Sequence, residues 1–191
     1  MDGVIRYAMK GNSIVSIDEA GIGRSSRLVC PACRLPLVAK KGYGFDHFSH
    51  VGGMDCRFGF NAMYIFLVAS VLRSTRRIFV PSCSCYEGMS VGLDDVDVSY
   101  SIDSHLPIIC IRSGSRRMLI SVKSDLQSIP GRDDAIKRSG ISALEMDLTF
   151  RSSLSEDAIR DLIENPSIHK RWIVNVRALK KQCSQLKAKG I

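Results

Sequence analysis

The chain has 191 residues, of which 45% are hydrophobic and 24% are charged, and its formal net charge is +8 at pH 7. These values predict a soluble chain with a buried core, folded as one domain or as a small module joined to a medium one. The seven cysteines are an odd number, which argues against a disulfide framework and for metal binding in a reducing compartment.

Targeting and membrane segments are not expected. The first residues lack the basic flank and the apolar run of a signal peptide. The longest apolar run, residues 62–71, is interrupted by Ser70 and is too short to span a bilayer. We therefore expect a cytoplasmic protein with no membrane partner.

Hydrophobic periodicity predicts the elements of the first part of the chain. Two β-hairpins are expected, one over 4–9 and 13–17 and one over 35–40 and 45–48. The apolar segment 57–76 has no polar face and predicts a buried helix.

The rest of the chain predicts a mixture of strands and helices. Strands are expected at 78–81, 95–102, 106–112, 117–123 and 141–150, with a tight turn at 113–115. A short helix over 133–139 ends at Gly140. A capping box formed by Ser153 and Glu156 opens a helix that ends at Glu164, and a last helix covers 168–188, with Trp172 on its apolar seam.

Five candidate metal ligands fall within 27 residues, beginning with a Cys-x-x-Cys pair; they are Cys30, Cys33, His47, His50 and Cys56. Thiolate and imidazole are the ligands that zinc prefers, and a structural site uses four of them. The 13 residues between Cys33 and His47 allow a β-hairpin to return the second pair to the first. On a regular strand, His47 and His50 point to opposite faces. Either the strand ends between them, or Cys56 replaces His47 as the fourth ligand.

Positive charge is concentrated at the C-terminal end. Residues 166–191 contain no carboxylate and hold seven cations: Lys170, Arg171, Arg177, Lys180, Lys181, Lys187 and Lys189. Such a local positive surface favours nucleic acid, here DNA, through counterion release. The alternative is a solvated basic helix face with no partner.

The second part of the chain has the layout of a restriction-endonuclease-like core. In such a core one strand contributes an Asp, and the next contributes an acid two residues before a lysine. The carboxylates hold one or two Mg²⁺ ions that activate water. The candidates are Asp97, with Asp95 on the same strand face, and Lys123; the position of the second acid is occupied by Ser121.

These features together resemble the competence protein CoiA-like family, which joins a zinc module to a PD-(D/E)XK nuclease-like core. The resemblance rests on the segments 30–33, 47–50, 97–98, 140–148 and 170–175 and on Lys123. It implies an α+β fold with a β-rich zinc-binding module over 1–56, a nuclease-like core over 57–150 and a C-terminal helical segment over 151–191. It also implies a role in DNA processing.

Two departures from the family pattern concern the chemistry. Ser121 stands where the family has a carboxylate, and the helix around 60–64 lacks the family's acid-and-histidine face. A hydroxyl in place of a carboxylate removes one anionic ligand, so the affinity for Mg²⁺ should fall.

Alternative functions follow from these departures. The first is an active nuclease whose missing acid comes from Asp125 or Glu145. The second is a degenerate core that binds nucleic acid, or a protein of a DNA-processing or defence system, with weak or no cleavage. A structural alternative is that Asp95, Asp97 and Lys123 form surface ion pairs and that Glu145 and Asp147 cap the next loop. A second metal site of Cys83, Cys85 and Cys110 is a weaker hypothesis, because it lacks a fourth ligand.

Overall fold

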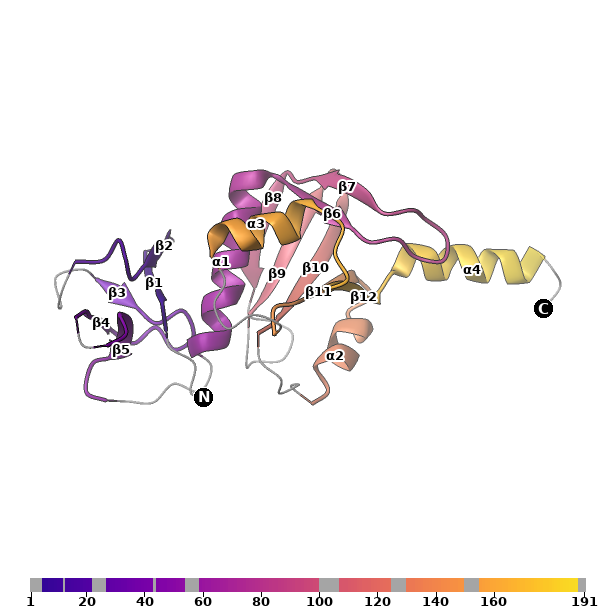
Figure 1. Cartoon of the computed structure of the whole chain (residues 1–191). Coiled ribbons are helices and arrows are strands. Elements are labelled where there is room, and N and C mark those ends of the chain that lie inside the picture. The colour runs from indigo at the N-terminus through magenta and orange to yellow at the C-terminus, as the bar shows by residue number, and fades with distance from the viewer. Residues whose placement is uncertain are drawn as a thin grey trace. The chain divides into compact units, whose positions relative to one another are not determined.

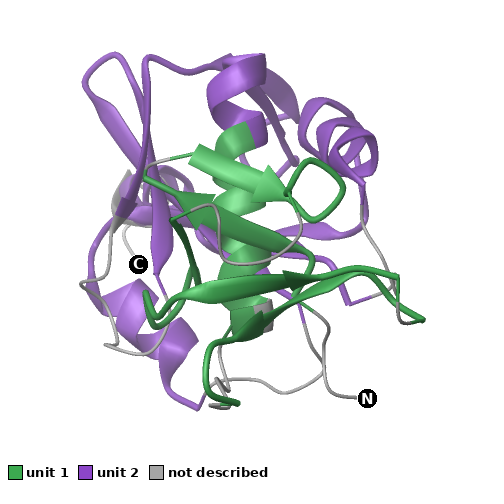
Figure 2. Ribbon diagram, turned by 90° about the vertical axis from the view of Figure 1, so that its left-hand side faces the viewer, with its two compact units in different colours: residues 1–70 green, residues 71–191 purple. Residues whose placement is uncertain are grey.

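The structure, a computed structural model, is a mixed α+β fold with several sheets. It describes residues 5–11, 13–21, 27–42, 44–53, 59–99, 107–124, 130–149 and 155–188. Two compact units cover residues 1–70 and 71–191 (Figure 2). The boundary falls inside helix α1 (Gly59–Thr75), so it lies later in the chain than the expected limit at residue 56.

The first unit contains the two predicted hairpins. Strands β1 (Tyr7–Lys10) and β2 (Ser13–Ser16) pair antiparallel, as do β4 (Leu37–Lys40) and β5 (His47–His50). A two-residue strand that was not predicted, β3 (Leu28–Val29), adds to β1. A small apolar core in this unit consists of residues from the hairpins and the segments next to them: Ala8, Ile17, Ala20, Leu28, Cys30, Leu37, Ala39 and Phe48.

Helix α1 and the predicted strands that follow it are present. Ten side chains of α1 between Ala62 and Leu72 are buried, which confirms a helix without a polar face. Strands β6 (Arg77–Val80) and β7 (Met89–Gly92) form a separate hairpin. Strand β7 was not predicted; it has only four residues, in which Ser90 and Gly92 alternate with Met89 and Val91.

A five-stranded sheet is the centre of the second unit (Figure 1). Its order is β12-β11-β10-β9-β8, and β10 and β11 are parallel, whereas the other neighbours are antiparallel. Helix α2 (Arg132–Arg138) connects the parallel pair, as parallel strands require a crossover. The strand bounds are β8 Asp95–Ser99, β9 Ile108–Ser113, β10 Arg116–Lys123, β11 Ser142–Asp147 and β12 Lys170–Val174.

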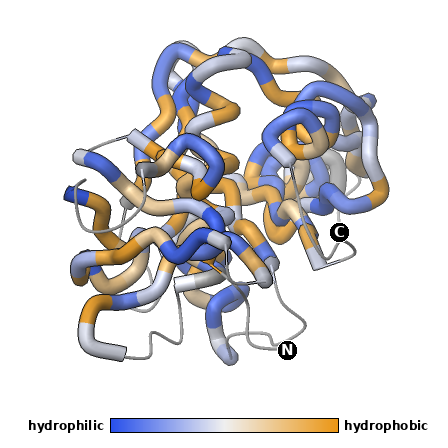
Figure 3. The backbone as a smooth tube through the Cα atoms, turned by 60° about the vertical axis from the view of Figure 1, so that its left-hand side comes forward, coloured by the Kyte–Doolittle hydropathy of each residue, from blue (hydrophilic) through white to orange (hydrophobic). Residues whose placement is uncertain are grey.

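The two faces of this sheet carry different helices. Ile136 of α2 packs on Ile108, Leu119 and Ala143, which share one face, here called the α2 face. Side chains alternate along a strand, so Ile109, Ile111, Ile120, Leu144 and Met146 lie on the opposite face. We call it the α3 face, because the side chain of Lys170 on this face reaches the end of helix α3 (Glu156–Glu164). Hydrophobic and hydrophilic residues alternate along much of the chain (Figure 3).

The segment 168–188 corrects the prediction of one continuous helix. Residues Lys170–Val174 form β12 at the edge of the sheet, and helix α4 covers Val176–Ala188. Trp172, Ile173 and Val174 favour extended structure, and β11 offers an unpaired edge. Asn175 then begins the helix, since its Oδ1 accepts a hydrogen bond from the backbone N–H of Ala178 at 3.0 Å. Trp172 therefore does not belong to the seam of α4.

The start of α3 also differs from the prediction. The helix begins at Glu156, and the Oγ of Ser155 accepts a hydrogen bond from the backbone N–H of Ala158 at 3.2 Å. Ser155 is thus the N-cap, and the capping box on Ser153 was wrong.

Because β12 belongs to the central sheet, residues after 155 are part of the second unit and do not form a separate helical segment. No helix in the described ranges is both long and apolar enough to cross a membrane.

Candidate functional site

Three of the five candidate metal ligands come together in the first unit. One ligand atom from each of Cys30, Cys33 and His50 lies within 4.8 Å of the others. The Cys33 Sγ lies 3.2 Å from the His50 Nε2. Cys30 is fully buried in the small core, whereas Cys33 is exposed.

The backbone explains why the two cysteines face the same point. The N–H of Cys30 donates to the carbonyl of Leu35 at 2.9 Å, and the N–H of Arg34 donates to the carbonyl of Cys30 at 3.0 Å. Arg34 adopts a left-handed backbone with φ 62°, a conformation that closes tight turns. The loop after β3 is therefore folded back on itself, and both thiols are carried on this turn.

The second hairpin brings the histidine to this loop. The register of β4 and β5 pairs Leu37 with His50, so the end of β5 lies beside the start of β4. The loop that carries the cysteines leads directly into β4, and Val29 bridges to Pro36. The expectation that a hairpin returns the later ligands to the cysteine pair is confirmed for His50.

The donor set fits a metal ion. In a tetrahedral zinc site with Zn–S near 2.3 Å and Zn–N near 2.0 Å, neighbouring ligand atoms are about 3.6–3.8 Å apart. The three atoms observed here are within 4.8 Å of one another, so small rotations of the side chains give that geometry. Cys30, Cys33 and His50 could hold a metal ion.

His47 does not join this group. It lies at the other end of β5, opposite Lys40, and its Nδ1 is 2.7 Å from the carbonyl oxygen of Phe45. Because β5 continues through His50, the two histidines project from opposite faces of the strand, as expected for regular β-structure. Cys56 lies outside the described residues.

The hypothetical second thiol site is not assembled. Among the described residues, the group of Cys30, Cys33 and His50 is the only cluster of three or more His, Cys, Asp or Glu side chains with metal-binding spacing. Cys110 lies on β9, where burial raises the pKa of its thiol, an effect reinforced by Asp97 and Asp95 and opposed by Arg117. A protonated thiol is a poor ligand.

The nuclease candidates share the α2 face but are spread across it. Asp97 is in register with Cys110 on β9, and Cys110 is in register with Leu119 on β10. Asp97 is therefore two strands away from β10, and Ser121 lies two residues further along. The Cα separation of Asp97 and Ser121 is about 12 Å from strand spacings, and that of Asp97 and Lys123 is about 16 Å. Because β9 lies between β8 and β10, Asp97 does not stand on a strand next to Ser121 and Lys123, and the register does not bring these groups side by side.

Lys123 pairs with a different carboxylate. Its Nζ donates to Asp147 at 3.3 Å, and the two residues are directly in register on the parallel strands. The Oδ1 of Asp147 accepts hydrogen bonds from the backbone N–H and the hydroxyl of Thr149, at 2.9 and 2.6 Å. Burial acts to raise the pKa of Asp147, but the bonds from Thr149 and the Lys123 ammonium outweigh it and lower the pKa. Asp147 thus caps the turn after β11, as one of the alternatives predicted.

Ser121 and Glu145 are register partners on β10 and β11, and both are nearly buried. The Nε of Arg171 donates to the Oε1 of Glu145 at 2.7 Å, and the Nη2 of Arg171 lies 3.6 Å from Asp133. Burial acts to lower the pKa of Arg171, but these two carboxylates raise it. Glu145 therefore faces a permanent cation.

A second arginine fills the space around Ser121. The Nη2 of Arg132 donates to the carbonyl of Pro107 at 3.2 Å, and its Nε is 3.5 Å from the Ser121 Oγ. Arg132 is buried at the first position of α2. In a nuclease of the expected type, the position of Ser121 holds a carboxylate that binds a cation. The positive charge of Arg132 beside Ser121 makes this position less favourable for Mg²⁺.

The remaining acidic candidates lie on the surface or outside the described part. Asp95 is exposed, with its Oδ2 at 4.0 Å from the Nη2 of Arg112. This agrees with the surface ion-pair alternative for Asp95, although its partner is Arg112 and not Lys123. Asp97 is exposed on β8. Asp125 lies outside the described residues.

The basic residues of 166–191 do not form one surface. Lys170 is only 3% exposed, and its Nζ donates to the carbonyls of Phe79, Asn165 and Ile163 at 2.8, 2.8 and 3.1 Å. Lys170 is therefore a structural residue, and its assignment to a nucleic-acid surface is corrected. The cause is its place on β12, where alternation turns its side chain toward α3.

Three cations of α4 are exposed: Arg177, Lys180 and Lys181. Lys180 and Lys181 follow Arg177 by three and four residues, so each lies on the same side of the helix as Arg177. The Cζ of Arg177 and the Nζ of Lys181 lie 4.6 and 4.9 Å from the centre of the Tyr86 ring. Arg171 is committed to Glu145 and Asp133. The side chain of Lys187 and all of Lys189 lie outside the described part.

The sequence analysis missed Arg132 and the pairing of Arg171 with Glu145. The contacts of Arg132 with Ser121 and of Arg171 with Glu145 join residues that are 11 and 26 positions apart in the chain, so no local pattern predicts them. Alternation along the predicted strand 141–150 places Glu145 and Asp147 on one face, which was an available signal. The identity of their cationic partners required the pairing of β10, β11 and β12.

Comparison of the chain with protein-family models, with curated proteins and with solved structures finds no match.

Proposed function

We propose that the chain is a nucleic-acid-binding protein of the cytoplasm, with a zinc-stabilised first unit and a nuclease-like second unit that does not cut its ligand. The order of elements supports the fold part of this proposal. Helix α1 is followed by the separate β6-β7 hairpin, then by three antiparallel strands, β8 to β10, and then by α2 and the parallel strand β11. This is the layout expected from the resemblance to the competence protein CoiA-like family.

One observation carries the proposal that cleavage is absent. Every described carboxylate at the ends of β10 and β11 is already paired with a cation: Asp147 with Lys123, and Glu145 with Arg171. A metal ion at this position would have to displace a charge-assisted hydrogen bond in each case. With Ser121 in the acid position, too few anionic ligands remain to hold Mg²⁺ in place.

The nucleic-acid part rests on the cations of α4. Arg177, Lys180 and Lys181 are exposed on a helix with no acidic residue within its 13 positions. Cations of this kind bind phosphates without reading sequence. Affinity should therefore fall with salt, with a slope of about 0.9 in log–log units per phosphate contact on duplex DNA, or about 0.7 on a single strand.

The test is a double charge reversal on α4. Lys180→Glu with Lys181→Glu should weaken binding to all sequences alike and lower the salt slope by about 1.4 to 1.8 for the two lost contacts. The matched control is Lys137→Glu with Arg138→Glu on α2, which changes the net charge equally and should have much less effect. Fluorescence anisotropy at several salt concentrations measures both. Equal losses in the two variants, or binding indifferent to salt, would refute the role of α4.

Catalysis needs a separate experiment. We expect no Mg²⁺- or Mn²⁺-dependent cleavage of plasmid or single-stranded DNA by the wild-type protein. Ser121→Glu alone should restore little activity, because Asp97 is not on a neighbouring strand and Arg132 lies beside position 121. Ser121→Glu combined with Arg171→Gln frees Glu145 as a second ligand, and this variant should show increased Mn²⁺ binding by calorimetry.

A second candidate, an active nuclease, is favoured by one contact in the sheet. Glu145 is the direct register neighbour of Ser121, so it is placed where a migrated acid would have to stand. Cleavage by the wild type, abolished by Glu145→Gln or Lys123→Ala but not by Asp97→Asn, would establish this alternative. Loss of cleavage in Asp97→Asn would instead support the original assignment.

For the first unit we propose zinc as the metal, with Cys30, Cys33, His50 and Cys56 as ligands. Two thiols and one imidazole form a donor set that zinc prefers, and His47 lies on the other side of β5. Bound zinc would supply folding free energy and no chemistry of reaction. Elemental analysis should find about one zinc per chain. Cys56→Ser should lower this content, and His47→Ala should not; the reverse pattern would show that His47 is the fourth ligand.

A further inference from the structure

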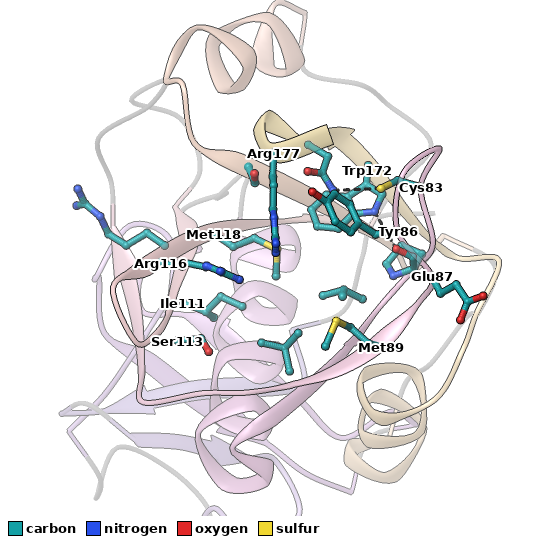
Figure 4. Close-up of a pocket in the computed structure, with 16 residues that line it drawn as sticks. Cys83, Tyr86, Glu87, Met89, Ile111, Ser113, Arg116, Met118, Trp172 and Arg177 are labelled. Carbon is teal, nitrogen blue, oxygen red and sulfur yellow. Dashed lines mark hydrogen bonds between the residues drawn. The ribbon is translucent and has the colours of Figure 1, made fainter. Parts of the chain in front are cut away.

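A pocket of about 200 Å³ lies in the second unit, on the α3 face of the sheet (Figure 4). Its floor is one row of the sheet, formed by Ile111, Met118 and Ser142, which are in register on β9, β10 and β11. This row is at the opposite end of β10 from Ser121 and Lys123, and on the other face. The pocket is therefore independent of the nuclease-like site.

Aromatic and sulfur-containing side chains form the walls. Trp172 of β12 is fixed by a hydrogen bond from its Nε1 to the carbonyl of Pro81 at 2.9 Å. Tyr86 is held in the loop between β6 and β7 by two backbone hydrogen bonds with Cys83, at 2.9 and 3.2 Å. Met89, 58% exposed, continues the apolar lining toward solvent. A slot with fixed aromatic walls favours a planar apolar group.

Positive charge surrounds the mouth of this slot. Arg116 at the start of β10 and Arg177 of α4 extend into the pocket, whereas the carboxylate of Glu87 points away from it (Figure 4). In the described part of the chain, neither guanidinium has an ion-pair partner; Arg177 contacts the Tyr86 ring instead. Two unpaired guanidiniums beside an apolar slot match a ligand that carries an anionic group next to a flat ring.

We propose that this pocket holds one unpaired nucleotide, with the base in the slot beside Trp172 and Tyr86 and the phosphate at Arg116 and Arg177. The volume is below the roughly 300–1,000 Å³ of clefts for drug-sized ligands, and so suits a single ring system. Stacking of a base on an aromatic side chain tolerates any sequence. The inference rests on the proposed nucleic-acid function and adds that the ligand presents an extrahelical or terminal base.

Trp172 makes the pocket directly observable, because it is the only tryptophan of the chain. Its fluorescence should be quenched saturably by dAMP and by TMP. Adenosine, which lacks the phosphate, and deoxyribose 5-phosphate, which lacks the base, should each bind at least tenfold more weakly than dAMP. Quenching that no nucleotide produces at millimolar concentration would overturn the proposal.

The role of Arg116 is tested by a pair of variants. Arg116→Gln should weaken dAMP binding about tenfold or more, which corresponds to one lost charge-assisted hydrogen bond, and should leave adenosine binding unchanged. The matched control is Arg112→Gln, on the neighbouring strand but on the α2 face, which should leave both unchanged. Equal effects of the two variants would show general electrostatics and no phosphate site.

Longer ligands separate this inference from the function that it rests on. A duplex with a single-stranded end should quench Trp172 more than the blunt duplex of equal length, and an abasic end should remove the difference.

Lys180→Glu should weaken duplex binding but leave dAMP quenching intact. If α4 variants lose duplex binding and no ligand quenches Trp172, the function stands and the pocket assignment fails. If dAMP quenches but α4 variants bind duplex normally, the pocket stands without the α4 surface. Tighter binding of an acidic aromatic peptide than of dAMP would reassign the pocket to a protein partner.

Discussion

Lys170 belongs to a basic segment of the sequence, but in the structure it is a buried structural residue. Within 166–191 it is one of seven cations, but its ammonium is enclosed by three carbonyl groups and lies 5.4 Å from the centre of the Phe79 ring. Burial lowers the pKa of Lys170 to about 8, an effect that Asp161 partly offsets. The residue ties β12 to β6 and to the end of α3.

Replacement of Lys170 tests this structural role. Lys170→Met removes the buried donor that three carbonyls share, so the free energy of unfolding should fall by about 2–4 kcal/mol. Lys180→Met is the control, and should change it by less than about 0.5 kcal/mol because Lys180 is exposed. Urea unfolding followed by circular dichroism measures both values. Equal stability of the two variants would show that the contacts of Lys170 contribute nothing net.

The lowered pKa of Lys170 predicts a pH dependence with a definite sign. The folded pKa is about 8 and the ordinary value is 10.5. Between these values the unfolded chain binds a proton that the folded chain has released, so stability rises with pH in this window. Below about pH 8 this residue gives no pH dependence. The rise, at most about 3 kcal/mol, should disappear in Lys170→Met; an identical rise in that variant would assign it to other groups.

At the scale of single elements, the caps decide where helices begin. The hydroxyl of Ser155 accepts the hydrogen bond that starts α3. Ser155→Ala should lower the free energy of unfolding by about 1 kcal/mol, and Ser153→Ala, which removes the hydroxyl of the capping box expected from the sequence, should have little effect. Thermal unfolding of the two variants compares them directly, and a larger effect of Ser153→Ala would restore the original assignment.

The parallel pairing of β10 with β11 decides which of the candidate nuclease residues become neighbours. It places Ser121 beside Glu145, and Lys123 beside Asp147. The antiparallel addition of β12 then brings Arg171 to Glu145. Strands β10 and β12 therefore supply the cations that pair with the two carboxylates of β11.

At the scale of the whole molecule, the two units should respond differently to removal of metal. In the described part of the first unit, the apolar cluster that contains Cys30 has eight buried residues, whereas zinc binding to a structural site supplies on the order of 10 kcal/mol. A strong chelator should unfold the first unit and leave the emission of Trp172, in the second unit, unchanged.

Hydrogen exchange by mass spectrometry measures this prediction, with Cys33→Ser as a variant that should behave as the chelated protein does. Protection should be lost in β4 and β5 and kept in β10 and β11. Unchanged protection of β4 and β5 after removal of all metal would refute a structural role of the site.

Local patterns in the sequence determined much of the fold and the metal group. The Cys-x-x-Cys turn, the return of His50 by a hairpin and the apolar helix α1 depend on residues close together in the chain, so composition and periodicity predict them. The tertiary structure alone decided which strands became neighbours. That pairing placed Asp97 and Lys123 on strands that are not neighbours. It also made residues 170–174 an edge strand, so that Lys170 is buried and Arg171 forms an ion pair with Glu145. Strand pairing depends on contacts between distant segments, and a single sequence carries little local signal for them.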